Sequence, residues 1–252
     1  MKTKTMAAGG YRYIPGVMQY SAGVGALPGH RVVRARFADV VPLKEGFARI
    51  AAHLDAIGRP LAAFCSCELR SPGQFTEEGF EAFNTLYADT LRDWKIMEGD
   101  DNPVARSNVC PEIDGPQEPG FHAFLYTVED DNPPATFAIA GSGEVPEGKS
   151  NYQDHIVRPG ETDPDALREK AAFVLNEMER RMSFFDGNWA QTTAAQIYTV
   201  HDIHPLIASE IAPRGAHRNG LTWHYNRPPI VGLDYEMDCR RVFDEIVLPP
   251  SV

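Results

Sequence analysis

Apolar residues near the start of the chain recur with helical spacing just before a glycine. The successive spacings are four, three, four and three residues, which predicts a helix with one buried face. Gly58 follows the last of these positions, and glycine suits the left-handed end of a helix. The apolar positions are Leu43, Phe47, Ile50, Leu54 and Ile57.

Two further helices are predicted from their starting signals. One begins near Thr76, where Glu77 and Glu78 favour the positive end of the helix dipole. The other begins at Asp163 and Pro164, a pair typical of an N-cap and the first helical position. Apolar residues follow both signals at helical spacing, so both helices are expected to bury one face. A short helix is also expected over 204–212.

Strand candidates are short apolar or alternating runs that lie between turn signals. In the first half they cover 17–24, 31–37, 61–69, 105–113 and 121–129. In the second half they cover 135–141, 192–200, 220–226 and 231–242.

A charged, turn-rich stretch at 129–134 separates two halves with a similar order of elements. A repeated order of elements indicates an internal duplication, although the letters of the two halves differ. We therefore expect two domains, at 10–130 and 131–252.

Composition and charge exclude several classes of protein. The 252 residues carry a formal net charge of −11, from 24 Lys and Arg against 35 Asp and Glu, and no basic run is present. This argues against nucleic-acid binding. No apolar stretch approaches the ~18–20 residues that span a bilayer, and the first residues lack the apolar segment of a secretory signal. Four scattered cysteines do not make a disulfide framework. We expect a soluble, cytoplasmic protein with no nucleic-acid or membrane partner.

The segment Ala105-Arg106-Ser107-Asn108-Val109 resembles an Ala-Arg-Ser-x-Val segment of the YjgF/RidA family of enamine/imine deaminases, whose arginine binds the substrate carboxylate. Residues 137–146 resemble the early strand and Ser-Gly loop of that family, and 21–24 lie at the corresponding place in the first half. The length and tandem arrangement are similar to those of bacterial 2-aminomuconate and 2-amino-5-chloromuconate deaminases.

The resemblance implies an α/β (α+β) fold class, with two tandem chorismate-mutase-like (RidA-like) domains, each a mixed β-sheet backed by two helices. In that family three domains close into a ring, with active sites in the clefts between neighbours. The implied partners are a small carboxylated substrate and further copies of the chain, in a homo-oligomer that is a trimer of two-domain chains or a hexamer.

A 2-aminomuconate is an enamine with two carboxylates, so its hydrolysis requires groups that bind a dianion and move protons. Water is the nucleophile, and no cofactor and no metal is required. Arg106 is expected to hold a carboxylate, because a planar guanidinium binds one bidentately. The other expected substrate-binding residues, some through backbone N–H groups, are Ser107, Ser21, Gly23, Ser142 and Gly143.

Two placements of the proton-transferring group remain open. The YjgF/RidA family has a water-activating glutamate on its last strand. In the first half His122 lies near that position, whereas in the second half Asp234 and Glu236 lie on the last strand and Leu221 stands about where the arginine belongs. Either a first-half site uses His122 as the base, or a composite cleft brings Arg106 toward Glu236. We favour the first-half site, because carboxylate binding is the harder feature to replace.

Two further catalytic candidates follow Arg106 on its own strand. Cys110 and Glu112 share its face by the period-two rule. Structural interpretations compete with each of these roles: Cys110 as a small buried apolar residue, His122 as a hydrogen-bonded structural histidine, and Arg106 as the partner of a surface acid.

Other functions also remain open. A broad deaminase acting on 2-aminoacrylate is the alternative among enzymes, and a non-catalytic ligand-binding protein is the alternative outside them. A second basic residue facing Arg106, such as Arg70 or Arg227, would favour the six-carbon diacid.

Metal and nucleotide cofactors have weak support in the sequence. His201, His204, His217 and His224 could be ligands, but His204 precedes Pro205 at the start of a helix, so His201 and His204 do not form a helical His pair. Cys65 and Cys67 lack a second closely spaced pair. No glycine-rich nucleotide-binding motif is present.

Overall fold

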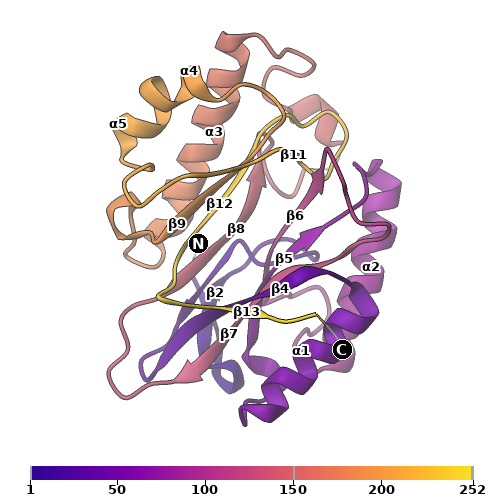
Figure 1. Ribbon diagram of the computed structural model, residues 1–252, viewed down its shortest axis with the longest axis vertical. Helices are drawn as coiled ribbons and strands as arrows, with labels where there is room; N and C mark the ends of the chain where they lie inside the picture. The colour runs from indigo at the N-terminus through magenta and orange to yellow at the C-terminus, as the bar shows by residue number, and fades with distance from the viewer. Residues whose placement is uncertain (1, 150, 251–252) are drawn as a thin grey trace.

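The strands of the chain form two sheets, which we call the β8 sheet and the β5 sheet after a central strand of each. The structure, a computed structural model, describes residues 2–149 and 151–250 (Figure 1). The strands are β1 (Lys4–Met6), β2 (Tyr11–Ile14), β3 (Gly23–Ala26), β4 (His30–Pro42), β5 (Phe64–Arg70), β6 (Ala105–Pro111), β7 (Gly120–Glu129), β8 (Phe137–Gly143), β9 (Ala194–Tyr198), β10 (Thr222–His224), β11 (Asn226–Arg227), β12 (Glu236–Arg241) and β13 (Asp244–Leu248).

The two sheets have different strand orders. The β8 sheet has the order β1-β2-β3-β8-β12-β9-β10, and the β5 sheet has the order β11-β6-β5-β7-β4-β13. Both are mixed, because β9–β10, β5–β6 and β4–β13 are parallel pairs among antiparallel ones.

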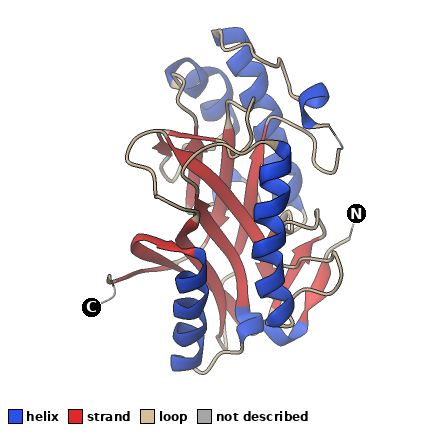
Figure 2. Cartoon of the chain, turned by 90° about the vertical axis from the view of Figure 1, so that its right-hand side faces the viewer, coloured by secondary structure: helices blue, strands red, loops and turns tan. Residues whose placement is uncertain are grey.

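The helices lie outside the sheets. Helices α1 (Leu43–Ala56) and α2 (Glu77–Asp93) cover the β5 sheet on the side that faces the viewer in Figure 2. Helix α3 (Pro164–Ser183) covers the β8 sheet, and α4 (His204–Leu206), a π-helical turn (Ile207–Ile211) and α5 (Ala212–Arg214) follow it. Short 3₁₀ turns cover Ala7–Gly9, Leu61–Ala63, Tyr152–His155 and Trp189–Gln191.

The local signals of the three long helices are confirmed. The Thr76 hydroxyl accepts a hydrogen bond from the Gly79 amide at 3.1 Å, so Thr76 is the N-cap of α2. The Asp163 carboxylate accepts hydrogen bonds from the amides of Asp165 and Ala166, so Asp163 caps α3, whose first residue is Pro164. These caps satisfy amides that have no partner within the helix.

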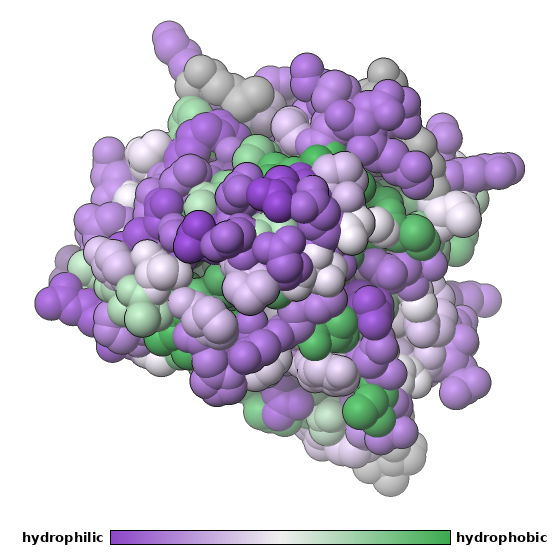
Figure 3. Space-filling model, turned by 90° about the horizontal axis from the view of Figure 1, so that it is seen from above, coloured by the Kyte–Doolittle hydropathy of each residue, from purple (hydrophilic) through white to green (hydrophobic). Residues whose placement is uncertain are grey.

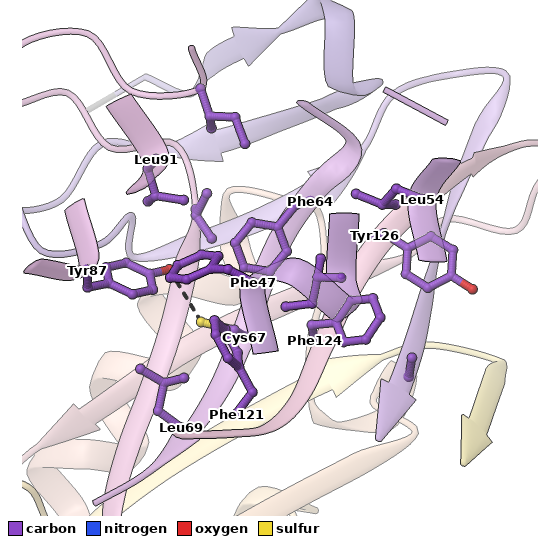
Figure 4. Close-up of a cluster of buried hydrophobic side chains, with 14 of the residues drawn as sticks. Phe47, Leu54, Phe64, Cys67, Leu69, Tyr87, Leu91, Phe121, Phe124 and Tyr126 are labelled. Atoms are coloured by element: carbon purple, nitrogen blue, oxygen red, sulfur yellow. Dashed lines mark hydrogen bonds between the residues drawn. The ribbon is translucent and has the colours of Figure 1, made fainter. Parts of the chain in front are cut away.

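An aromatic core fixes α1 and α2 against the β5 sheet (Figure 4). The Phe47 ring of α1 packs edge-on against Phe121 of β7 at 4.9 Å between centroids. On the α2 side, the Tyr87 hydroxyl lies 3.3 Å from the Cys67 thiol of β5. Burial of these side chains is the main stabilising term for this layer.

The expectation of two tandem RidA-like domains is wrong, because each sheet contains strands from both halves of the chain. The early strand β3 pairs antiparallel with β8, with Gly23 opposite Ile139. Conversely, the late strand β13 pairs parallel with β4 at the edge of the β5 sheet. The correct description is a mixed α+β fold with two shared sheets. The predicted boundary near 130 does not separate these sheets, and residues 251 and 252 of the predicted second domain lie outside the described residues.

Sheet register places two candidate residues near each other. On β6, Arg106 is paired with Cys67 of the parallel strand β5. On β12, Glu236 lies opposite Gly143 of β8 and Tyr198 of β9. Strands β6 and β8 belong to different sheets but lie in contact, and a single β-bridge joins Ser21 to Ala105 at this seam.

The face seen in Figure 3 is mostly hydrophilic, with hydrophobic side chains in separate patches. Among residues 2–149 and 151–250, no helix has both the length and the apolar character to cross a bilayer.

Candidate functional site

Arg106 is a buried guanidinium enclosed by aromatic rings. Its side chain is 2% exposed. The guanidinium carbon lies 4.9 Å from the ring centroid of Tyr87 and 5.6 Å from those of Tyr20 and Phe83. One nitrogen, Nη2, donates a hydrogen bond to Asn84 Oδ1 at 2.6 Å. These contacts hold the plane of the guanidinium in one orientation.

The other terminal nitrogen of Arg106 has no hydrogen-bond partner among the described residues. Nη1 is buried and makes no hydrogen bond within the described residues, and no described carboxylate lies within ion-pair distance of the guanidinium. A buried charge with an unused donor is costly unless an anion pairs with it. The geometry therefore fits a carboxylate ligand.

Arg106 faces a pocket at the seam between the two sheets, which we call the Arg106 pocket. Its walls come from α2, β6, β8, β12 and the segments around residues 17–20, 145–152 and 229–233. It is lined by Val17, Tyr20, Phe80, Arg106, Asn108, Gly141, Ser142, Gly143, Val145, Glu147, Gly148, Tyr152, Pro229, Ile230, Leu233 and Glu236.

Glu236 supplies a carboxyl group to the same pocket. Its side chain is 4% exposed and lines the pocket together with Arg106. Burial raises the pKa of Glu236 well above its usual range, and the negative charges of Asp238 and Glu144 raise it further, against the opposing charges of Arg181 and Arg70. Glu236 therefore holds its proton to higher pH than an ordinary glutamate, which suits a group that acts as an acid.

Gly141 makes room for this carboxyl group. A methyl group on Gly141 would overlap the Glu236 carboxylate and lie 3.0 Å from Ser107 Cβ. Glycine is thus required by a close approach of side chains rather than by backbone conformation.

A buried ionic network fixes the chain immediately before Glu236. Lys170 of α3 contacts Asp234 Oδ2 at 2.6 Å and Glu144 Oε1 at 3.2 Å. The Glu144 carboxylate also accepts hydrogen bonds from the backbone amides of Asp234 and Tyr235. This network positions the start of β12 and, with it, the Glu236 side chain.

Four of the residues expected from the sequence meet in the Arg106 pocket: Arg106, Glu236, Ser142 and Gly143. Of the two arrangements left open by the sequence, this is the composite one, built within a single chain. Ser107 points to the other face of β6 and lies beside Gly141.

The favoured base, His122, does not line this pocket. Burial and the charge of Arg70 lower its pKa to about 3, so the imidazole is neutral and a weak base at neutral pH. Cys110 is buried, and burial together with Glu236 raises its thiol pKa to about 12. Glu112 is exposed and paired bidentately with Arg227.

Ser21 and Gly23 have structural contacts at the seam. The Ser21 hydroxyl donates to the Pro103 carbonyl at 3.1 Å, and its amide donates to the Val104 carbonyl. Gly23 pairs with Ile139 of β8. Neither residue lines the Arg106 pocket.

Sequence reasoning missed several residues that line the pocket, among them Tyr20, Phe80, Asn108, Gly141 and Glu147. Asn108 could have been found, because it lies two residues after Arg106 on a strand and so shares its face. The Asn108 Nδ2 atom is also buried and has no hydrogen-bond partner in the part of the chain that the structure describes. The others come from separate elements and share no local signal.

The described residues contain no group of three or more His, Cys, Asp or Glu side chains that could hold a metal ion. Cys65 and Cys67 are both buried, and neither forms a disulfide with another described residue.

Comparisons with known proteins agree with one another. A family model described as "2-aminomuconate deaminase CnbZ" matches residues 3–246. A 2-amino-5-chloromuconate deaminase from Comamonas testosteroni is 48% identical over 242 residues, which are 95% of this chain and 96% of that protein. They support the resemblance to muconate deaminases, but they do not place the chain in the YjgF/RidA family.

The fold is also similar to that of a solved structure. A crystal structure of a chorismatase matches with a TM-score of 0.55 and 9% identity, over 96% of this chain and 80% of that one. At this identity the likeness concerns the fold alone. This likeness agrees with the finding that the chain does not form two tandem RidA-like domains.

Proposed function

The chain belongs to the 2-aminomuconate deaminase CnbZ family, and from this premise we propose that the Arg106 pocket hydrolyses the C–N bond of 2-aminomuconate or its chloro-substituted analogue. The substrate is an enamine with a carboxylate at each end. Protonation at carbon gives the protonated imine, water adds to the imine carbon and gives up a proton, and the resulting carbinolamine loses ammonia. One water is consumed, and a 2-oxo diacid and ammonia are released.

Arg106 is the proposed anchor for one substrate carboxylate. The single observation that carries this assignment is its buried guanidinium with a free Nη1 donor and no carboxylate partner among the described residues. Charge-assisted hydrogen bonds to a carboxylate would satisfy that donor. The aromatic enclosure excludes water from the pair and so strengthens it.

Glu236 is the proposed proton-transferring group. In its protonated form it donates a proton to the enamine carbon, and as a carboxylate it then accepts a proton from the attacking water. The same carboxyl can serve both steps because they occur in sequence. Its raised pKa provides the acid form needed first.

Ammonia release from freshly generated 2-aminomuconate tests these roles. Glu236→Gln should lower kcat by about 100-fold or more while leaving KM nearly unchanged, because the amide cannot exchange a proton. Glu112→Gln is the matched control, since Glu112 is an exposed glutamate outside the pocket, and it should keep parental kcat.

The outcomes separate the proposal from its alternatives. Loss of kcat in His122→Asn with full kcat in Glu236→Gln would assign the chemistry to the first-half arrangement. Faster turnover of 2-aminoacrylate than of 2-aminomuconate would favour the broad deaminase, and no ammonia from either substrate would favour a binding protein. The expected homo-oligomer stays a prediction, which light scattering can test.

A further inference from the structure

Arg70, the last residue of β5, is a second buried guanidinium with an unused donor. Its side chain is 3% exposed. Nη1 donates to the Leu69 carbonyl at 2.9 Å, whereas Nη2 is buried and has no partner among the described residues. No described carboxylate forms an ion pair with it at 4 Å or less. Its charge is therefore uncompensated by direct contact.

The position of Arg70 brings this charge close to Glu236. The Arg70 guanidinium lies 5.5 Å from the ring centroid of Tyr198. Tyr198 of β9 and Glu236 of β12 are directly opposite in an antiparallel pair, so their side chains share one face of the sheet. Arg70 does not line the Arg106 pocket, but its charge acts on Glu236 and opposes the effect of burial.

Cys110 of β6 gives a second sign of this proximity. The charges of both Glu236 and Arg70 act on its thiol, the first raising and the second lowering its pKa. Groups on three different strands, Arg70, Cys110 and Glu236, therefore form one cluster.

The other charged residues around Glu236 are either acids or arginines that have another role. Asp238 on the same strand and Glu144 after β8 are both acids. Arg181 from α3 contacts Glu147 at 2.8 Å and Glu177 at 2.8 Å, and Arg106 in the pocket is the proposed substrate anchor.

The two histidines beside Arg70 add no charge to this cluster. Burial and Arg70 lower the pKa of His122 to about 3 and that of His224 to about 4. Both are therefore neutral at the pH of the reaction. Arg70 is the remaining cation without a carboxylate contact in the described cluster.

We propose that Arg70 is a positioning residue that stabilises the ionised form of Glu236, so that this one carboxyl can give up its proton in the first step and take one from water in the second. The inference rests on the proposed function of Glu236. A carboxyl buried beside two further acids holds its proton tightly, and a nearby cation makes the release easier. Arg70 thereby sets the rate of proton transfer without touching the substrate.

The test is the pH dependence of kcat for ammonia release from 2-aminomuconate in Arg70→Gln and Arg70→Lys. Activity needs protonated Glu236 first, so kcat falls on the alkaline side as Glu236 ionises. Because the charge of Arg70 lowers the pKa of Glu236, its loss should move this alkaline limb upward, by about one pH unit. At neutral pH kcat should fall by about tenfold, with KM unchanged. Arg70→Lys keeps the charge and should keep the limb near its parental position.

Arg227→Gln is the matched control. Arg227 is paired with the exposed Glu112, so its removal should leave the alkaline limb in place. Asp238→Asn tests the same idea with a different residue if Arg70→Gln does not fold. It removes a negative charge beside Glu236 and should move the limb to lower pH.

Two results would overturn the inference. An unmoved alkaline limb in both Arg70→Gln and Asp238→Asn would show that these charges do not act on Glu236. A raised KM with an unmoved limb in Arg70→Gln would make Arg70 a substrate anchor instead. Full activity of Glu236→Gln would refute the proposed function itself, so the two failures are distinguishable.

Discussion

Replacing Gly141 by alanine would test whether the seam between β8 and β6 holds Glu236 in its working position. The added methyl group would lie 3.0 Å from Ser107 Cβ and 3.2 Å from Ser107 Cα, and it would overlap the Glu236 carboxylate. Ordinary contacts between carbon atoms are about 3.5–4.0 Å. Either Ser107 on β6 or the Glu236 side chain must therefore move, and the side chain is the softer of the two.

The expected effect is larger on activity than on stability. Overpacking at a buried position costs about 1–3 kcal/mol, which lowers the melting temperature of a chain of this size by roughly 2–12 °C. A displacement of the catalytic carboxyl by about 1 Å should lower kcat by about 100-fold. The assays are ammonia release under saturating substrate and calorimetric melting of the same preparations.

Gly73→Ala is the matched control, because a methyl group there meets nothing within 4 Å. It should change stability by no more than about 0.5 kcal/mol and leave kcat unaltered. Parental kcat in Gly141→Ala would refute the argument that the Glu236 carboxyl must occupy its present position. A loss of kcat no larger than the fraction of unfolded protein would also refute this argument, because unfolding alone would then explain the loss.

Three further predictions follow from the buried charges of the site. Arg106→Lys should raise KM by about tenfold or more, because an ammonium cannot bind a carboxylate bidentately, and steady-state kinetics with 2-aminomuconate measures this. Because the pKa of Glu236 is raised on folding, its stabilising contribution is complete below about pH 4.5 and is lost as pH rises through the folded pKa. Glu236→Gln should therefore melt higher than the parent at alkaline pH, with the difference shrinking toward pH 4.5. Lys170→Met would leave Glu144 and Asp234 without their buried counter-charge and should lower the free energy of unfolding by about 3–5 kcal/mol, measured by urea denaturation.

Each of these three has a result that would count against it. An unchanged KM in Arg106→Lys would remove the carboxylate anchor. A stability difference between Glu236→Gln and the parent that is constant with pH would contradict the raised pKa. For Lys170→Met, the exposed Lys44→Met serves as the control, and equal stability of the two variants would show that the network contributes little.

The sequence predicted the elements whose signals are local. Thr76 caps α2, Asp163 and Pro164 begin α3, and the spacing from Leu43 to Leu54 matches α1. Cap hydrogen bonds and a buried helix face involve residues close together in the chain, so they leave a readable pattern.

The pairing of strands between the halves left no such pattern. Nothing near Gly23 indicates that β3 pairs with Ile139, and nothing near Ile246 indicates that β13 pairs with Ala35. Both pairings form through backbone hydrogen bonds that any side chain permits. The duplication inferred from the order of elements therefore led to separate domains instead of shared sheets.

The sequence named candidate residues and two possible arrangements of them, but it did not decide between these arrangements. Arg106 was expected from its flanking residues, and Glu236 was one of two candidate groups for proton transfer. Their meeting in one pocket depends on contact between β6 and β8, which belong to different sheets. The sequence gives no sign that His122 is buried beside Arg70, which lowers the pKa of its imidazole to about 3, and its proposed role as the base remains to be tested.

The shared sheets have a consequence for folding during synthesis on the ribosome. Strand β3 is synthesised early, but one of its edges stays unpaired until β8 has been made. One edge of β4 stays unpaired for longer, until β13 has been made. Until then each nascent strand presents bare amide and carbonyl groups to its surroundings. A ribosome that stalls soon after β8 would hold a polypeptide in which both sheets are incomplete, because β9, β10 and β12 of one sheet and β11 and β13 of the other have not been made. Chaperones are expected to bind this form.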